Sequence, residues 1–186
     1  MFNYLWVNFK INIMKKVLLI TLLCFGFITA NAQRYKPGLK AGLNNTNLTG
    51  DANTDARFGF YIGGLVDFLV SDKFHVQPEL LYSTEGGDDD AGISYLRIPI
   101  MGKYYVTENF NLQAGPQIAF KMSTEEDVID EATKSTDIAL GLGGAYELES
   151  GLFFDIRYNL GLTNISDVDG LDFGNTGLQF GLGYRF

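Results

Sequence analysis

Few residues in this chain have side chains that could carry out chemistry. The sequence contains one histidine, His75, and one cysteine, Cys24. His75 has acidic residues in neighbouring segments, as a protease-like or acyltransferase-like site would need, but no Ser/His/Asp set with its members within hydrogen-bonding reach is apparent. One histidine and one cysteine are too few for a disulfide framework or for a zinc site built on several such ligands. We therefore expect no catalytic residues, no cofactor and no metal-binding residues.

Two acidic segments resemble calcium-binding loops in composition: residues 88–90 are three aspartates, and residues 167–172 read DVDGLD. Neither segment has the EF-hand spacing, because the glycine of the second falls too early and no bidentate glutamate follows. We expect solvated acidic loops that repel lipopolysaccharide or bridge it through divalent ions.

The composition excludes two classes of protein. The 186 residues include 14 Lys and Arg against 22 Asp and Glu, a formal net charge of −8, so nucleic-acid binding through a basic face is excluded. Aromatic residues make up 14% of the chain, far too many for a disordered acidic protein. The length is that of one domain.

The N-terminal segment has the layout of a secretory signal. A basic pair, Lys15 and Lys16, precedes an apolar stretch at 17–28. This stretch is shorter than the ~20 residues that a membrane-spanning helix needs, which disfavours a retained anchor. The small residues at the expected cleavage site, and the residue after it, are Ala30, Ala32 and Gln33.

We predict cleavage after Ala32. Residues 1–32 are then an N-terminal extension and signal peptide, and residues 33–186 are the exported domain. Residues 1–13 precede a better-formed start and add nothing that a signal needs. Because Cys24 lies in the removed segment, the exported domain contains no cysteine.

Beyond the signal, apolar residues alternate with polar residues or glycine, which is typical of strands rather than helices. Strands of about ten residues match the ~9–11 that a tilted strand needs to cross a bilayer. We expect eight strands, at 36–44, 57–69, 74–84, 93–106, 111–122, 136–148, 152–164 and 176–186.

One face of every expected strand is free of charge. From the second strand onward this face is formed by the even-numbered positions, which are rich in Phe, Tyr, Leu and Ile. In the first strand it is formed by Leu39, Ala41 and Leu43. The opposite face is rich in glycine and carries the ionisable residues Lys40, Asp67, His75, Glu79, Arg97, Lys103, Lys121, Asp137, Glu147, Asp155, Arg157 and Arg185.

Volume decides which face points inward. The interior of an eight-stranded barrel is only just wide enough to be filled by side chains, so the bulky apolar face would overfill it. An outward apolar surface is solvated by lipid, and closure of the barrel leaves no unpaired backbone edge. The sequence therefore predicts an all-β fold: an eight-stranded antiparallel transmembrane up-and-down β-barrel, preceded by a cleavable signal peptide.

The connections between strands support this orientation. Those near 71–73, 107–109 and 149–151 are short, as periplasmic turns are, and the others are longer, as external loops are. The expected external loops hold the acidic residues Glu85, Asp88, Asp89, Asp90, Glu125, Glu126, Asp127, Asp130, Glu131, Asp167, Asp169 and Asp172.

The inward charges predict a paired network rather than an open pore. A charge in a narrow lumen is costly unless it meets a partner. A continuous water-filled channel typically needs 16 to 18 strands. The expected central network sets Arg97, Lys103 and Arg157 against Glu79, Asp137 and Asp155.

Several runs resemble a known family: VQPELLYSTEGG (76–87), YLRIPIMGKYYV (95–106), LQAGPQIAF (112–120) and IRYNLGLTNI (156–165). They are similar to the eight-stranded outer-membrane β-barrel domains abundant in Bacteroidota, labelled "porin family" or "PorT family", with an OmpA/OmpX-like barrel. The resemblance implies that Pro78, Pro99 and Pro116, which lie in these runs, are built-in bulges or bends. It also implies that the aromatic residues of the C-terminus, Tyr184 and Phe186, are a signal for the barrel-assembly machinery.

Three functions are compatible with these observations. The first is a non-enzymatic, monomeric structural or interaction protein of the outer membrane, surrounded by lipid and lipopolysaccharide, whose acidic loops meet an extracellular ligand or protein. The second is a narrow porin-like channel or transporter for small solutes. The third, implied only by the resemblance, is a PorT-like accessory of a secretion system.

Overall fold

The structure is a computed structural model that describes residues 35–50, 56–86, 92–124, 134–165 and 173–186. The predicted signal peptide and its cleavage site at Ala30, Ala32 and Gln33 lie outside these residues. No helix in the described part of the chain is long and apolar enough to cross a membrane.

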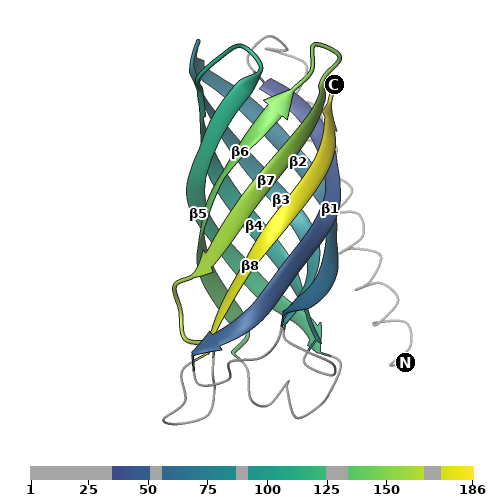
Figure 1. Cartoon of the computed structure of the whole chain (residues 1–186), viewed down its shortest axis with the longest axis vertical. Helices are drawn as coiled ribbons and strands as arrows, with labels where there is room; N and C mark the ends of the chain where they lie inside the picture. Colours follow the sequence, from purple (N-terminus) through teal and green to yellow (C-terminus); the bar gives the residue numbers. More distant parts are fainter. Residues whose placement is uncertain (1–34, 51–55, 87–91, 125–133, 166–172) are drawn as a thin grey trace, which may run out of the picture. The chain divides into compact units, whose positions relative to one another are not determined.

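Eight antiparallel strands form a closed barrel in which each strand pairs with its neighbours in sequence (Figure 1). This confirms the predicted fold class. The strands are β1 (Tyr35–Gly50), β2 (Arg57–Ser71), β3 (Phe74–Gly86), β4 (Gly92–Tyr105), β5 (Phe110–Thr124), β6 (Thr136–Glu147), β7 (Leu152–Gly161) and β8 (Phe173–Arg185).

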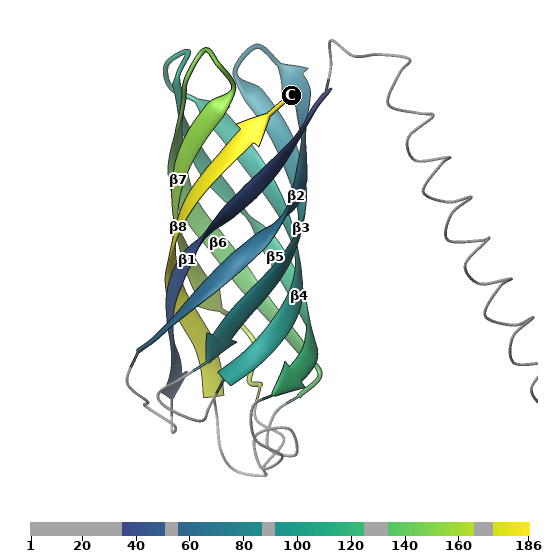
Figure 2. The same ribbon diagram turned by 90° about the vertical axis from the view of Figure 1, so that its right-hand side faces the viewer.

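The barrel closes between its first and last strands. β1 runs antiparallel to β8, with register pairs from Gly38–Arg185 to Gly50–Phe173. Figure 2 shows these two strands side by side, crossing the barrel obliquely. Because closure satisfies the backbone of both terminal strands, no strand edge of the barrel is exposed to lipid.

The two ends of the barrel differ. At one end, which we call the short-turn end, the connections at 72–73, 106–109 and 148–151 lie beside the C-terminus (Figures 1 and 2). At the other, the loop end, lie the opposite ends of the strands, such as Gly50 of β1 and Gly86 of β3. Short periplasmic turns alternating with external connections are the arrangement of outer-membrane barrels.

Strands β1 and β8 are longer than the sequence predicts. The first strand was predicted to end at position 44, but β1 continues to Gly50. Its partners on β8 continue the ladder, with Thr46 opposite Gly177 and Leu48 opposite Asn175. Pairing with a neighbouring strand outweighs the weak local preference of the polar residues.

The outward face of the barrel is apolar. Its residues include Phe58, Leu43 and Phe180, which are 76%, 62% and 51% exposed. Most charged side chains of the strands lie on the opposite face, inside the barrel. This division follows the predicted parity of the strands, including the opposite parity of β1.

Glycine on the inward face leaves room for the large side chains of the lumen. A Cβ atom at Gly42 would lie 2.7 Å from the hydroxyl of Tyr61, and one at Gly183 would lie 2.2 Å from the ring of Phe153. Tyr61 and Phe153 are both about 1% exposed. The lumen is therefore filled, as expected for a barrel of this size.

The prolines of the family-like runs do not shift the strand register. Pro78 pairs with Ile100, and Leu81 with Arg97, in one unbroken register. Pro99 and Pro116 also lie in unbroken registers with β5 and β6. The irregularities recorded in the ladder occur between Leu69 and Ser71 and between Ser94 and Tyr95, so these prolines do not mark bulges.

Candidate functional site

The lumen contains a set of buried charges, and these are the main candidates for function. Five cationic side chains and six carboxylates point into it, and all but one are at most 3% exposed. They are Lys40, Arg97, Lys103, Arg157, Arg185, Asp67, Glu79, Glu85, Asp137, Glu147 and Asp155.

A first cluster lies in the middle of the barrel. Arg157 on β7 donates hydrogen bonds to both carboxylate oxygens of Glu79 on β3, at 3.0 and 2.8 Å. Its Nη2 atom also donates to Gln113 Oε1 at 3.0 Å. Lys40 on β1 contacts Asp155 at 2.6 Å and Glu79 at 3.6 Å. Two cations thus neutralise two carboxylates across the lumen.

A second cluster lies toward the loop end. Arg97 on β4 forms a two-pronged ion pair with Glu85, and its Nη2 atom lies 3.0 Å from Asp137 Oδ2. Ser83 Oγ and Asn175 Nδ2 donate to Glu85 at 2.8 and 2.5 Å. Charge-assisted, two-pronged contacts of this kind are the strongest hydrogen bonds that proteins form.

A third cluster lies at the short-turn end. Lys103 Nζ lies 2.7 Å from Asp67 Oδ2 and 3.2 Å from the hydroxyl of Tyr105. Arg185 pairs with Glu147 and lies 3.5 Å from Asp67. Tyr105 donates a hydrogen bond to Glu147 at 2.9 Å, which joins the two ion pairs into one network.

The structure brings together some of the residues that the sequence analysis paired. Arg157 meets Glu79 and lies 3.6 Å from Asp155, and Arg97 meets Asp137. Lys103 instead lies against Asp67. It reaches Glu79 only indirectly, because Gln77 accepts a hydrogen bond from Lys103 and donates one to Glu79.

Sequence reasoning misplaced Glu85. Its prediction as an external loop residue is wrong, because β3 continues to Gly86 and holds Glu85 inside the lumen, 2% exposed. The signal was available, since Glu85 has the same odd parity as Glu79. The other acidic residues predicted for the external loops lie outside the described residues.

An apolar layer lies beyond the Arg97 cluster at the loop end. Ile93, Tyr95 and Ala119 form a buried hydrophobic cluster. Leu48 and Ile165 are also buried, at 5% and 0% exposed. Within the described residues, the lumen therefore contains both ion pairs and apolar side chains at this end.

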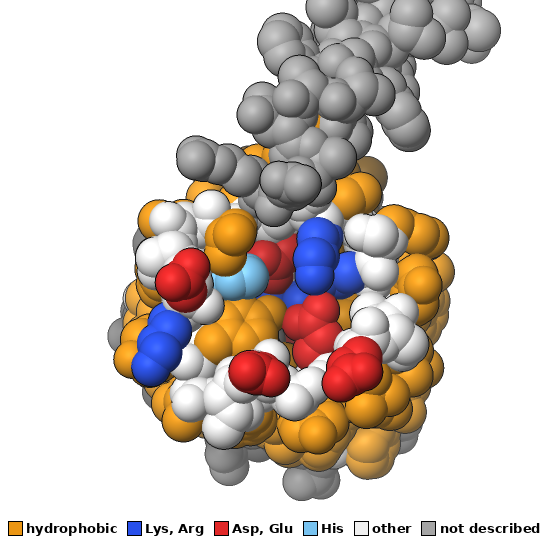
Figure 3. Space-filling view, turned by 90° about the horizontal axis from the view of Figure 1, so that it is seen from above, with side chains coloured by type: hydrophobic (Ala, Val, Ile, Leu, Met, Phe, Trp, Pro, Cys, Tyr) orange, Lys and Arg blue, Asp and Glu red, His pale blue; other side chains and the backbone are white. Residues whose placement is uncertain are grey.

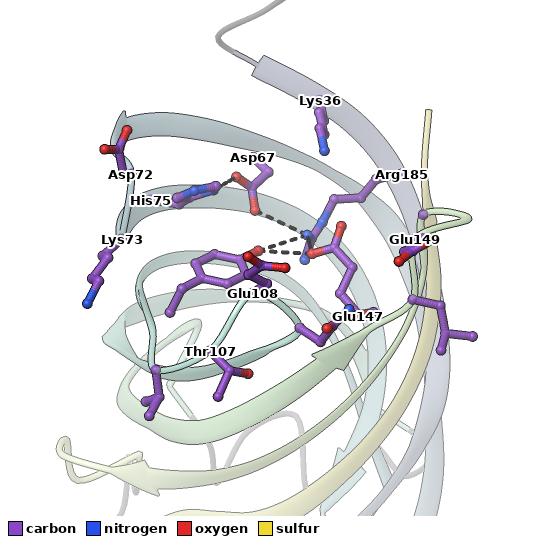
Figure 4. A pocket seen from close by; sticks show the side chains of 15 residues that line it. Lys36, Asp67, Asp72, Lys73, His75, Thr107, Glu108, Glu147, Glu149 and Arg185 are labelled. Carbon is purple, nitrogen blue, oxygen red and sulfur yellow. Dashed lines mark hydrogen bonds and ion pairs between the residues drawn. The ribbon is translucent and has the colours of Figure 1, made fainter.

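The short-turn end, in contrast, opens into a cavity of about 630 Å³. Viewed from this end, charged side chains surround and fill the mouth inside a ring of apolar residues (Figure 3). Asp67, Glu147 and Arg185 of the third charge cluster lie in the floor, and the short turns form the rim (Figure 4). We call this cavity the vestibule.

His75 is part of the vestibule. Its Nδ1 atom pairs with Asp67, and its ring lies 4.5 Å from the ring of Tyr105. The residues recorded in contact with His75 supply no serine or cysteine nucleophile, so the described geometry forms no nucleophile–His–Asp set. Within the described residues, no group of three or more potential ligands is placed to hold a metal ion.

The C-terminal aromatic residues lie on the outer surface. Tyr184 and Phe186 are 44% and 70% exposed, and their rings make an edge-to-face contact at 5.3 Å. The backbone N–H of Phe186 donates to Pro37 at 2.9 Å, so the end of the chain is held against β1.

The sequence and structure have clear relatives. Residues 19–186 match the family described as outer membrane protein beta-barrel domain. No curated protein matches the chain. The structure is similar to Ail, the attachment invasion locus protein of Yersinia pestis, in complex with the heparin analogue sucrose octasulfate. The two chains are 17% identical, with a TM-score of 0.53, and the match covers 83% of this chain and 100% of Ail. It is also similar to Neisserial surface protein A, with 12% identity, a TM-score of 0.52, and coverage of 81% of this chain and 97% of that protein.

These likenesses concern the fold, since both structural relatives are distant in sequence. The family match is broader, because it includes all eight strands. It agrees with the apolar outward surface, which lipid solvates better than water does. It also agrees with the closed backbone ladder, which leaves no strand edge unpaired in the bilayer. The chain belongs to the outer membrane protein beta-barrel domain family and is a β-barrel protein of the outer membrane.

Proposed function

We propose that this protein is a non-enzymatic, non-conducting, monomeric barrel that acts as a structural or interaction protein. In this proposal the acidic connections at the loop end face the cell exterior, where they repel lipopolysaccharide or bridge it through divalent ions and meet an extracellular ligand or another protein. The signal peptide exports the chain through the inner membrane before assembly. The observation that carries the proposal is the occupation of the lumen by ion pairs at three levels.

The physical reason is the cost of opening these clusters. A solute ion that passed the middle of the barrel would have to separate Arg157 from Glu79, and both side chains are at most 1% exposed. Removing one partner of a buried ion pair typically costs about 3–5 kcal/mol. A pathway would also have to pass the Arg97–Glu85 pair, which is similarly buried.

The external role rests on charge. The connections at the loop end carry most of the acidic residues of the chain outside the lumen. Acidic loops favour divalent cations or a basic partner and disfavour polyanions. A ligand like the sucrose octasulfate in the Ail complex is therefore not expected to bind these loops, despite the shared fold.

Two alternatives remain predictions from the sequence. A narrow channel for small solutes would require the lumen clusters to rearrange. A PorT-like role in secretion rests on the resemblance to the Bacteroidota family alone. Deletion of the gene would test it, with loss of secreted cargo supporting that role and unchanged secretion dismissing it.

Conductance in planar bilayers tests the proposal. We expect no steady single-channel current from the folded protein. A double variant, Glu79→Ser with Arg157→Ser, removes the central pair without changing the net charge and serves as a matched control with a wider lumen. Insertion of both proteins is checked by the heat-dependent shift in gel mobility that folded barrels show. A steady current from the unmodified protein would contradict the proposal and support the channel.

A further inference from the structure

The vestibule is a pocket at the short-turn end of the barrel. Its floor includes Asp67, Arg185 and Glu147, which are already paired: Arg185 with Glu147 and Asp67, and Asp67 also with Lys103. Its volume of about 630 Å³ lies within the range of small-molecule binding sites, roughly 300–1,000 Å³. In outer-membrane barrels the short turns face the periplasm, so a ligand would enter from that side.

The charges of the rim are divided between two sides. Lys36 on β1 and Lys73 in the β2–β3 turn lie on one half of the barrel circumference. Glu108 in the β4–β5 turn and Glu149 in the β6–β7 turn lie on the other half. Figure 3 shows charged side chains of both signs around the mouth, and Figure 4 shows where Lys36, Lys73, Glu108 and Glu149 lie on the rim. Asp72, next to Lys73, partly offsets the basic side.

These four rim side chains are available to a ligand. No side-chain hydrogen bond or ion pair to another described residue is recorded for Lys36, Lys73, Glu108 or Glu149. On the floor, Glu147 on one side and His75 on the other each have one polar atom that is hydrogen-bonded to a described residue and one that is not. Glu147 uses its Oε2 atom for Arg185 and Tyr105.

On the basic side, His75 uses Nδ1 for Asp67, and its side chain is 18% exposed. Among the described residues, no partner is recorded for Nε2 of His75 or for Oε1 of Glu147. A ligand that reached the floor would therefore meet an imidazole nitrogen on one side and a carboxylate oxygen on the other.

The turns hold the acidic side in place. Thr107 Oγ1 accepts a hydrogen bond from the N–H of Phe110 at 3.0 Å, and Asn109 Nδ2 donates to the carbonyl of Glu147 at 2.9 Å. Gly151 adopts a φ of 89°, which favours glycine, and closes the β6–β7 turn with a hydrogen bond to Leu148 at 2.9 Å. These bonds fix the backbone of the two turns that carry Glu108 and Glu149.

We propose that the vestibule binds a short zwitterionic peptide from the periplasm. Its ammonium group lies toward Glu108, Glu147 and Glu149, and its carboxylate lies toward Lys36 and Lys73. A dipolar ligand satisfies both sides at once, whereas a purely cationic or purely anionic ligand of the same size meets one side that repels it.

The first test uses tri-alanine as the probe, with both ends free, with an acetylated N-terminus, or with an amidated C-terminus. Binding is measured by calorimetry at low salt on the folded protein in detergent micelles. We expect the free peptide to bind best. Loss of either terminal charge should lower affinity by about fivefold, the effect of one exposed ion pair at the upper end of its range.

Paired variants give the test its specificity. Glu108→Gln with Glu149→Gln should remove the preference for a free ammonium group but keep the preference for a free carboxylate. Lys36→Gln with Lys73→Gln should do the reverse. The matched control Glu125→Gln with Glu126→Gln changes the same charge in the β5–β6 connection, and it should bind all three peptides as the unmodified protein does. Gel mobility confirms that each variant is folded.

Three results would overturn the inference: equal affinity for the three peptides, no binding at all, or the same loss of binding in every variant including the control. Each of these can occur while the protein remains silent in bilayers, so the vestibule proposal can fail when the non-conducting barrel stands. Conversely, crossed peptide preferences with a steady current would support the vestibule and reject the closed lumen.

Discussion

The buried ion pairs of the lumen depend on each other at the scale of single residues. Arg157 has three partners in the central cluster, Glu79, Asp155 and Gln113, and Lys40 bridges the two acids. A charge in this environment is tolerated only because its partners are already in place. Removing one partner is therefore more harmful than removing a complete pair.

We predict that Glu79→Ala lowers the free energy of unfolding by about 3–5 kcal/mol, because it leaves Arg157 without its two-pronged partner. The double variant Glu79→Leu with Arg157→Met removes both charges and keeps the Lys40–Asp155 pair, so it should lose much less. Unfolding in urea, followed by gel mobility, measures both. Glu149→Ala on the rim is the surface control, with an expected change within ~0.5 kcal/mol. If the double variant were as unstable as Glu79→Ala, pairing would not be the reason.

Individual strands show how well the alternation of residues predicts the sheet. β3 begins at Phe74 and β6 at Thr136, as expected from the sequence. The ends at the loop side were less predictable, because β1, β3, β5 and β8 extend beyond the apolar pattern. Apart from Leu48 and Phe173 these extensions consist of polar residues and glycine, so the apolar alternation is lost there, and pairing with the neighbouring strand keeps them in the sheet.

The outward position of Leu140 on β6 provides a test at this scale. Leu140 pairs with Pro116 on one side and Leu160 on the other, in the middle of three adjacent strands. We predict that Leu140→Arg destabilises the folded barrel by about 2–4 kcal/mol, the cost of arginine near the bilayer midplane. Val70→Arg, near the end of β2, is the matched control and should cost about 0–1 kcal/mol. Unfolding in lipid vesicles measures the difference, and equal costs would contradict the assigned lipid face.

The barrel as a whole has a filled interior and an apolar exterior. The loop end is occupied by ion pairs and an apolar layer, and the short-turn end opens into the vestibule. Pairing of β1 with β8 closes the barrel and also holds the C-terminus in the β-sheet. Assembly of the barrel therefore depends on the last strand reaching its place.

We propose that Tyr184 and Phe186 form the signal for barrel assembly, and this gives a prediction for the whole molecule. Tyr184→Ala with Phe186→Ala should reduce the amount of folded protein in outer-membrane fractions several-fold, while unfolded chains accumulate in the periplasm. Phe180→Ala removes another outward aromatic ring of the same strand and is the control. Equal yields from both variants would show that the terminal pair has no special role.

The sequence alone determined the strands, their parity and the lipid-facing surface of this protein. Each of these depends on the period-two alternation of side chains along one strand, which is a local property. It also predicted that the inward charges would be paired, because a narrow lumen allows little else.

Only the tertiary structure decided which charges meet. Arg97 lies against Glu85 as well as Asp137, and Lys103 lies against Asp67, because strand tilt and register set the level of each side chain in the lumen. The vestibule likewise appears only when three turns and the start of β1, distant in sequence, meet around one opening. Partners across a closed barrel are a property of the whole ladder, and alternation within a strand contains no information about them.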